Sequence, residues 1–149
     1  MRFMLLMKGD PPQDPQQGPG GQAWNEEFVG EIVRAMNAYA EDLRAAGVLL
    51  AEAGLYPSWA SRGILFSGGA AAPRVVDGPF SESKEVIAGF YLIEVSSEAE
   101  ALEWAKRCPI DKALPPGVET VFEVRRVADV DSDMTTEQAT EVVWGSITQ

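Results

Sequence analysis

Two carboxylates, one amine and one phenol stand at positions where this chain could do chemistry. Asp77 lies in the turn sequence Asp-Gly-Pro-Phe, and Lys84 follows it within one or two helical turns. An ammonium group close to a carboxylate keeps the carboxylate ionised, so that it could orient a substrate or accept a proton. Glu52 interrupts an apolar segment, and Tyr91 lies inside another, where its phenol could reach a ligand. These residues suggest a ligand pocket between a helix and a sheet, with Asp77 as the catalytic candidate and a lining of Asp77, Phe80, Lys84, Glu52 and Tyr91.

Each of these residues also has a purely structural interpretation. In Asp77-Gly78-Pro79-Phe80 the Asp can cap its own turn, the Gly permits a positive φ, the Pro fixes φ and the Phe anchors the loop. Glu52 fits a strand whose polar side faces solvent, and an aromatic residue such as Tyr91 usually packs in a core. The residues alone leave both interpretations open.

Composition removes several classes of mechanism. The chain has 149 residues and no histidine, so no imidazole can act as a general base or a metal ligand. Cys108 is the only cysteine, which excludes an intrachain disulfide and a CxxC site. Asp129, Asp131 and Asp133 alternate, but they lack the glycine and the distal glutamate of a calcium loop. We therefore expect no metal and no cofactor.

Charge and hydropathy limit the partners. The formal net charge is -11, and a field of this sign repels phosphate backbones and anionic lipid. No segment approaches the roughly 18 apolar residues of a membrane span, and the first ten residues do not resemble a signal peptide. We expect a cytoplasmic protein without direct nucleic-acid or membrane binding. After Val127 the chain carries acidic residues but neither Lys nor Arg, so we expect a domain over 1–127 and an acidic extension over 128–149.

Hydrophobic patterning predicts the elements that must position these residues. A helix is expected from the cap Asn25 to Gly47, and a second from the cap Ser97 to Cys108. Continuous or alternating apolar runs predict strands over Arg2–Lys8, Val48–Leu55, Ile87–Val95 and Val118–Val127, with a hairpin of Arg62–Ser67 and Arg74–Asp77 inserted at one edge.

The order of the elements predicts an α+β fold. It matches the split βαβ or ferredoxin-like arrangement, an antiparallel sheet with two helices on one face. Two helices cover only one face, yet the central strands are apolar on both. A homodimer that stacks sheet on sheet, the dimeric α+β barrel, would cover the second face. The alternative cover is a short helix capped by residues 135–138 in the acidic extension.

Residues 76–85, VDGPFSESKE, and 88–94, AGFYLIE, resemble the DGPF branch of the YCII-related family. Further matches are MRFMLLMKGD at the start, RAAGVLLAEAGLYP at 44–57 and EALEWAKRCP at 100–109. The resemblance implies a dimeric α+β barrel. Some YCII-like relatives use a His-Asp pair, and one branch dehydrochlorinates a chlorinated ring. This chain has no histidine, so that activity does not carry over.

Three functional hypotheses follow. The first is a small dimeric domain that binds a small molecule, with any lyase or isomerase-like step relying on carboxylates instead of histidine. The second, which the family resemblance implies, is an accessory protein of an extracytoplasmic-function sigma-factor stress system that makes protein contacts through its acidic extension. In the third, the Asp-Gly-Pro-Phe motif serves folding alone.

Overall fold

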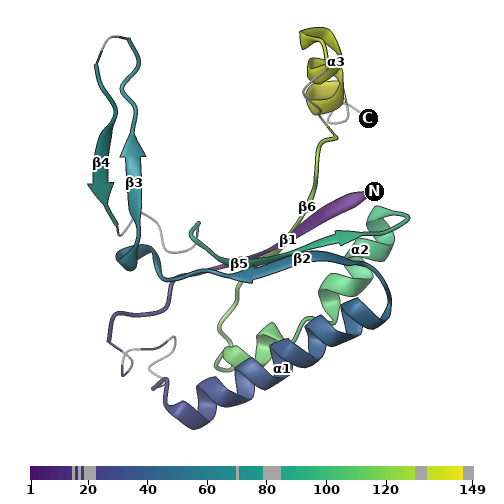
Figure 1. Cartoon of the computed structure of the whole chain (residues 1–149). Coiled ribbons are helices and arrows are strands. Elements are labelled where there is room, and N and C mark those ends of the chain that lie inside the picture. The colour runs from purple at the N-terminus through teal and green to yellow at the C-terminus, as the bar shows by residue number, and fades with distance from the viewer. Residues whose placement is uncertain are drawn as a thin grey trace.

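The computed structural model describes residues 1–14, 16, 18, 23–69, 71–78, 85–129 and 134–145. Its main body is a four-stranded antiparallel sheet in the order β2-β5-β1-β6, with two helices on one face (Figure 1). The strands of this sheet are β1 (Arg2–Lys8), β2 (Leu49–Gly54), β5 (Ile87–Glu94) and β6 (Phe122–Arg126). The helices are α1 (Glu26–Ala45) and α2 (Glu98–Lys106), with a third, α3 (Thr136–Thr140), near the C-terminus. The α+β fold with an antiparallel sheet is confirmed.

The inserted hairpin is a sheet of its own. β3 (Arg62–Leu65) pairs with β4 (Arg74–Asp77), and neither strand joins the four-stranded sheet. The expected hairpin is therefore present, but it does not extend the edge of the main sheet. Another difference is that β6 begins at Phe122 instead of Val118. Its partner β1 ends at Lys8, so residues before Phe122 have no strand to pair with.

Side-chain caps set the helix ends where the sequence predicted them. The Asn25 side chain accepts a hydrogen bond from the Phe28 amide at 2.9 Å, and Gly47 takes the positive φ of 72° that lets the chain leave α1. At α2 the Ser97 hydroxyl accepts the Glu100 amide at 3.1 Å. Ser97 and Glu100 have the S-x-x-E spacing of a capping box, but the Glu100 carboxylate reaches Ser96 instead of Ser97, so only half of the box forms.

Strand alternation divides the sheet into two faces. On the covered face, Phe3 and Leu5 of β1 and Ile93 of β5 are buried beneath the helices, packed with Leu43 of α1. The strand register aligns Phe3 with Ile93 and Leu5 with Tyr91, so both central strands contribute the same side of their pleat. This face holds the core of the described chain.

The opposite face, here called the open face, has no element packed across it among the described residues (Figure 1). Its centre is apolar. The register aligns the side chains of this face in two rows, Ala51-Leu92-Met4-Arg125 and Ala53-Phe90-Leu6-Glu123, with the charges at the β6 edge.

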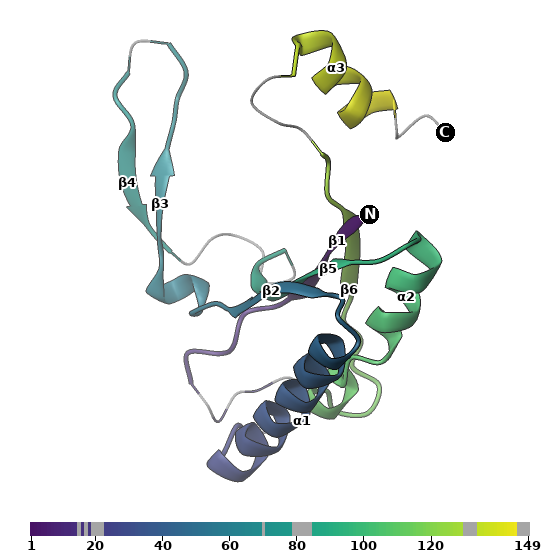
Figure 2. The same cartoon turned by 45° about the vertical axis from the view of Figure 1, so that its right-hand side comes forward.

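Two segments rise on the open-face side of the sheet, one at each end (Figures 1 and 2). The hairpin arm is residues 62–77, and the C-terminal arm is residues 134–145. The C-terminal arm begins with a capping box between Thr135 and Gln138, as the sequence suggested. The arm does not lie across the sheet, so it does not cover the open face. No helix in the described ranges has the length and hydrophobicity needed to cross a membrane.

Candidate functional site

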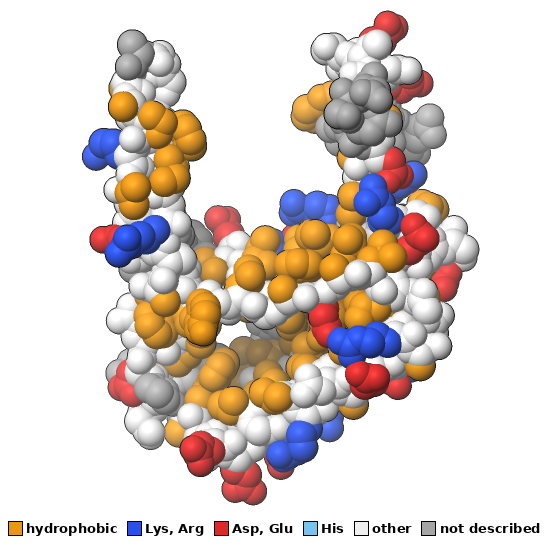
Figure 3. Space-filling view, in the orientation of Figure 1, with side chains coloured by type: hydrophobic (Ala, Val, Ile, Leu, Met, Phe, Trp, Pro, Cys, Tyr) orange, Lys and Arg blue, Asp and Glu red, His pale blue; other side chains and the backbone are white. Residues whose placement is uncertain are grey.

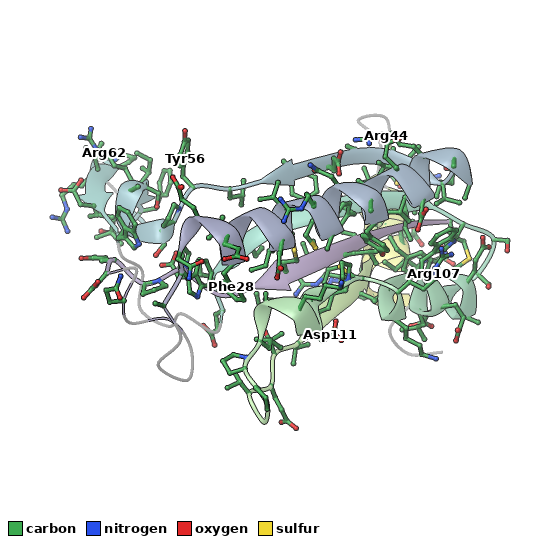
Figure 4. The ribbon with its side chains drawn as sticks, turned by 90° about the horizontal axis from the view of Figure 1, so that it is seen from below. Phe28, Arg44, Tyr56, Arg62, Arg107 and Asp111 are labelled. Atoms are coloured by element: carbon green, nitrogen blue, oxygen red, sulfur yellow. The ribbon has the colours of Figure 1, made fainter. Side chains whose placement is uncertain are left out.

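A recess lies between α1 and the edge strand β2. Only the C-terminal half of α1 packs closely on the sheet, where Tyr39, Ala40 and Leu43 are buried. In the N-terminal half, Phe28 and Ile32 are only partly buried. The space-filling view shows this region hollowed, with mostly hydrophobic walls (Figure 3). Figure 4 shows α1 crossing the sheet, with Phe28 near its N-terminal end and Arg44 near its C-terminal end.

Two glycines form part of the covered face next to this recess. The strand register sets Gly54 of β2 beside Gly89 of β5 and Met7 of β1. A Cβ atom at Gly54 would meet nothing within 4 Å, whereas one at Gly89 would lie 2.7 Å from Met7 Cε and 2.8 Å from the Ala53 carbonyl oxygen. The space beside Gly89 is therefore filled by the protein, and the space beside Gly54 is open.

Tyr91 lies in the next row of the same face. Its ring packs edge-on against Tyr39, with the centroids 5.2 Å apart and the planes at 88°. The Tyr39 hydroxyl donates to the Trp104 carbonyl at 2.8 Å, but the Tyr91 hydroxyl has no hydrogen-bond partner among the described residues. No buried side-chain N or O atom of the described chain is left unpaired, so this hydroxyl must reach accessible space.

The protonation state of Tyr91 follows from its burial. Burial of the phenol, together with the neighbouring Cys108 and Glu52, raises the pKa of Tyr91 to about 12, against an opposing effect of Arg44. At neutral pH the Tyr91 phenol therefore keeps its proton. It is a hydrogen-bond donor that no described residue uses.

Glu52 stands directly beside Tyr91 across the β2–β5 pair. This register puts Glu52 on the covered side of the sheet, but in the edge strand β2 the residue stays exposed, as the interpretation of a strand with its polar side in solvent expects. The Glu52 carboxylate pairs with the Arg44 guanidinium, which also binds Glu41 at 2.5 Å. The Arg44 side chain thus links the last turns of α1 to β2.

Asp77 lies in a different sheet from Glu52 and Tyr91. It belongs to β4 in the two-stranded sheet, whereas Glu52 and Tyr91 belong to the four-stranded sheet. Its side chain is 84% exposed and lies 3.4 Å from Arg62. Phe80 and Lys84, the other two members of the predicted pocket, lie outside the described residues. Of the three predicted residues that the structure describes, it brings Glu52 and Tyr91 together and places Asp77 elsewhere.

The glycine that follows Asp77 has a clear structural role. The Gly78 amide donates to the Ser61 carbonyl at 2.9 Å, and a Cβ atom at Gly78 would overlap the Ser58 carbonyl oxygen at 1.9 Å. Only glycine allows this approach of two backbones. The described half of the motif therefore fits the structural interpretation.

A polar network that the sequence did not predict holds this turn to the end of β1. The Asp10 carboxylate accepts the Ser58 amide at 2.8 Å and also the Ser58 hydroxyl. The Trp59 indole donates to the Pro11 carbonyl at 3.2 Å. Asp10 follows a buried strand and Ser58 follows a proline, and these positions alone do not predict a hydrogen bond between them. Only the fold shows that the two segments meet.

The sequence also gave no indication of Arg44, Gly54 or Gly89 as parts of the site. In the sequence Arg44 is an ordinary basic residue in the last turn of a helix, where its positive charge interacts favourably with the helix dipole. The glycines belong to different strands, and their pairing depends on the register.

The chain is similar in sequence to a known protein family and to an uncharacterized protein. The profile of the family described as "YCII-related domain" matches residues 1–131. An uncharacterized protein of Rhizobium meliloti (strain 1021), R00369, is 38% identical over 84 residues, which cover 56% of this chain and 66% of that protein. The chain thus spans about two thirds of the length of that relative.

Among solved structures, a similar chain is the 5-chloro-2-hydroxyhydroquinone dehydrochlorinase of Burkholderia phenoliruptrix AC1100 in complex with 2,5-dihydroxybenzoquinone. The sequence identity is 19%, the TM-score is 0.43, and the match covers 85% of this chain and 93% of the other. The ligand and the reaction in that description are properties of that enzyme.

Proposed function

The chain belongs to the family of YCII-related domains, and from this premise we propose that it binds a small molecule in the recess between α1 and β2. The Asp-Gly-Pro-Phe sequence at 77–80 leads us to assign it to the DGPF branch. Since the chain has no histidine, any reaction in this recess proceeds without an imidazole.

The observation that carries the proposal is the unpaired Tyr91 hydroxyl. Because this hydroxyl reaches accessible space, water can accept its hydrogen bond when no ligand is bound, and a ligand oxygen can replace that water. The Tyr91 side chain is 4% exposed and has no partner among the described residues, while its neighbour Tyr39 is fully paired. A ligand that accepts this hydrogen bond would keep the hydroxyl paired while its apolar body is removed from water.

The surroundings define the chemistry of that ligand. The open space beside Gly54 and the apolar residues of the N-terminal half of α1 favour a hydrophobic body. The Tyr91 phenol favours an oxygen acceptor on that body. Glu52 already pairs with Arg44, so this ion pair forms a polar boundary without offering a free cation. We therefore expect a compact, mainly apolar molecule with a carbonyl or similar oxygen.

A pair of probes that differ in one oxygen tests this proposal. Acetophenone and ethylbenzene have bodies of similar size, but only acetophenone offers a carbonyl. A ligand that binds the native state raises the melting temperature. We expect both probes to raise the Tm of the wild-type chain, with the larger rise from acetophenone.

Two variants separate the parts of the site. Gly54→Leu fills the open space and should abolish both shifts, whereas Tyr91→Phe should remove only the preference for acetophenone. Leu50→Ala changes an exposed residue of the same strand and serves as the control, with both shifts retained. Equal shifts in the wild type and in Gly54→Leu would contradict the proposed location.

We further propose that the chain forms a homodimer through its open face. The two rows of this face place the partly buried Phe90, Leu92 and Met4 around Leu6, which is itself buried. An apolar sheet surface of this kind is typical of an interface, and stacking two sheets buries both copies of it. Sedimentation equilibrium should give twice the chain mass of 16.1 kDa, and a monomer at all concentrations would refute this assembly.

A further inference from the structure

The two arms contain apolar side chains that their own contacts leave exposed. In the hairpin arm Phe66 is 72% exposed and Val75 is 64% exposed, and in the C-terminal arm Trp144 is 64% exposed. The strands of the hairpin arm pack chiefly on each other, and α3 contacts chiefly the π-helical segment Glu141–Gly145 that continues it. Neither arm rests on the four-stranded sheet.

Segments of this size are weakly stable when they stand alone. A single two-stranded hairpin is marginal in water, and so is a helix shorter than about 12 residues. The base of the C-terminal arm is held to β1, since Arg2 Nη2 binds Asp129 Oδ1 at 2.6 Å and the Val127 amide donates to the Arg2 carbonyl at 2.9 Å. This anchor sets where the arm leaves the sheet, but it leaves Trp144 uncovered. Each arm therefore needs a surface from outside the chain.

The two arms have opposite charge. Residues 62–77 hold two arginines and one aspartate, a net charge of +1, and Arg74 makes no ion pair with a described residue. Residues 134–145 hold two acidic residues, Glu137 and Glu141, and no basic one, a net charge of -2. Each arm also exposes hydrophobic side chains. The two arms are therefore both apolar in part and complementary in charge. They stand at opposite ends of the open face of one copy and cannot meet within it (Figures 1 and 2).

Twofold symmetry gives two ways to stack two open faces. One axis in the plane of the interface brings hairpin arm to hairpin arm and C-terminal arm to C-terminal arm. A second axis, also in the plane of the interface but at right angles to the first, brings each hairpin arm to the C-terminal arm of the other copy. The first arrangement sets two acidic segments beside each other, which is electrostatically unfavourable. The second sets positive beside negative.

We propose that the hairpin arm of one copy docks on the C-terminal arm of the other in a twofold dimer. This inference rests on the homodimer proposed above. The occupant of each arm is thus a second copy of this chain, with the apolar side chains of Phe66, Val75 and Trp144 at the contact. The charge difference between the arms selects the axis of the dimer.

Disulfide trapping tests which arms meet. One chain carries Val75→Cys and a second, tagged chain carries Trp144→Cys, and the two are refolded together and oxidised. Cys108 is buried, and burial raises the pKa of its thiol to about 12, so it stays unreactive, and the wild-type chain serves as the control. We expect the mixed disulfide to exceed the two like disulfides at least about tenfold, a difference of about 1.4 kcal/mol.

The mass of the wild-type chain separates the two possible failures. A monomer by sedimentation refutes the homodimer and this inference together. A dimer that yields like disulfides, or no disulfide, refutes the pairing of the arms and leaves the homodimer standing.

Charge reversal gives a second readout. Arg74→Glu should weaken dimerisation at least about threefold, and Glu141→Arg in the same chain should restore it, because the pairs then have opposite charge again. Arg34→Glu is the matched control, since it makes the same charge change in α1, a helix that lies on the opposite face of the sheet from both arms (Figure 1). Equal weakening by Arg34→Glu and Arg74→Glu, or no rescue, would refute the charge pairing.

Discussion

The two faces of the four-stranded sheet have similar side chains but different cover. On the covered face Leu5 and Ile93 are completely buried under α1 and α2. On the open face Met4 and Leu92, which neighbour them along the same strands, are only partly buried. Strand alternation produces both faces, but the chain supplies helices for one. The covered face therefore stabilises the single chain, and we expect the open face to contribute through association.

The covered face itself has two unequal ends. Where α1 ends, Tyr39 and Leu43 fill the space over the sheet. Where α1 begins, the sheet offers Gly54 instead of a side chain, and the recess remains. Close packing at one end and open space at the other is the arrangement expected of a binding domain, because a fully packed face would leave no room for a ligand.

Truncation of matched leucines on the two faces should give the largest contrast. Leu5→Ala removes a completely buried side chain and should lower the free energy of unfolding by about 2–5 kcal/mol. Leu92→Ala should lower the free energy of unfolding by less than Leu5→Ala does, when both are measured by urea unfolding at low protein concentration. Its cost should grow with concentration if a second copy covers the open face. If the two variants lost the same free energy of unfolding at every protein concentration, the proposed difference between the faces would be contradicted.

Alanine at the two paired glycines compares filled with open space. Gly89→Ala pushes a Cβ atom against Met7 and the Ala53 carbonyl, and should cost about 1–3 kcal/mol. Gly54→Ala adds a methyl group to the recess and should change the stability by less than about 1 kcal/mol. Chemical unfolding of both variants measures this, and a large loss at Gly54 would show that the space is not available.

A charge on the open face should weaken association more than folding. Leu92→Glu places a carboxylate where the second copy packs, and we expect a rise in the dimer Kd of at least about tenfold, or about 1.4 kcal/mol. Sedimentation measures the Kd, and circular dichroism checks the fold. A Leu92→Glu chain that dimerises as the wild type does would place the interface elsewhere.

The smallest effect concerns alkaline pH. Burial raises the pKa of Tyr91 from 10.0 to about 12 and that of Cys108 from 9.0 to about 12. The protonated forms are favoured in the folded state, so their contribution is complete below about pH 9 and is lost as the pH rises towards 12. Urea unfolding at pH 8 and pH 11 should show a smaller decrease for Tyr91→Phe than for the wild type. Tyr56→Phe, on an exposed ring, should decrease as the wild type does.

Local signals in the sequence were enough for most of the elements. Apolar runs predicted β1 and β5, and polar caps such as Asn25 and Ser97 predicted the starts of both long helices. These features depend on residues a few positions apart. Boundaries set by a distant partner were predicted less well, as in β6, whose first residue depends on the end of β1.

The candidate site was predicted only in part. Glu52 and Tyr91 were recognised as polar residues in apolar segments, but the sequence could not say which way Glu52 faces. Their grouping with Asp77 assumed one pocket, whereas the structure puts Asp77 in a separate sheet. Arg44 was overlooked because its role depends on the approach of α1 to β2.

The sequence by itself determined that the chain has no imidazole chemistry, that its elements follow a β-α-β, hairpin, β-α-β order, and that its net charge is concentrated in an acidic end. These properties follow from composition and from short-range pattern. Only the tertiary structure decided that Gly54 faces open space, that the Tyr91 hydroxyl has no partner among the described residues, and that two arms of opposite charge flank one sheet face. Such facts depend on strand register and on the directions in which segments leave the sheet, because contacts between residues far apart in the chain arise only when it folds.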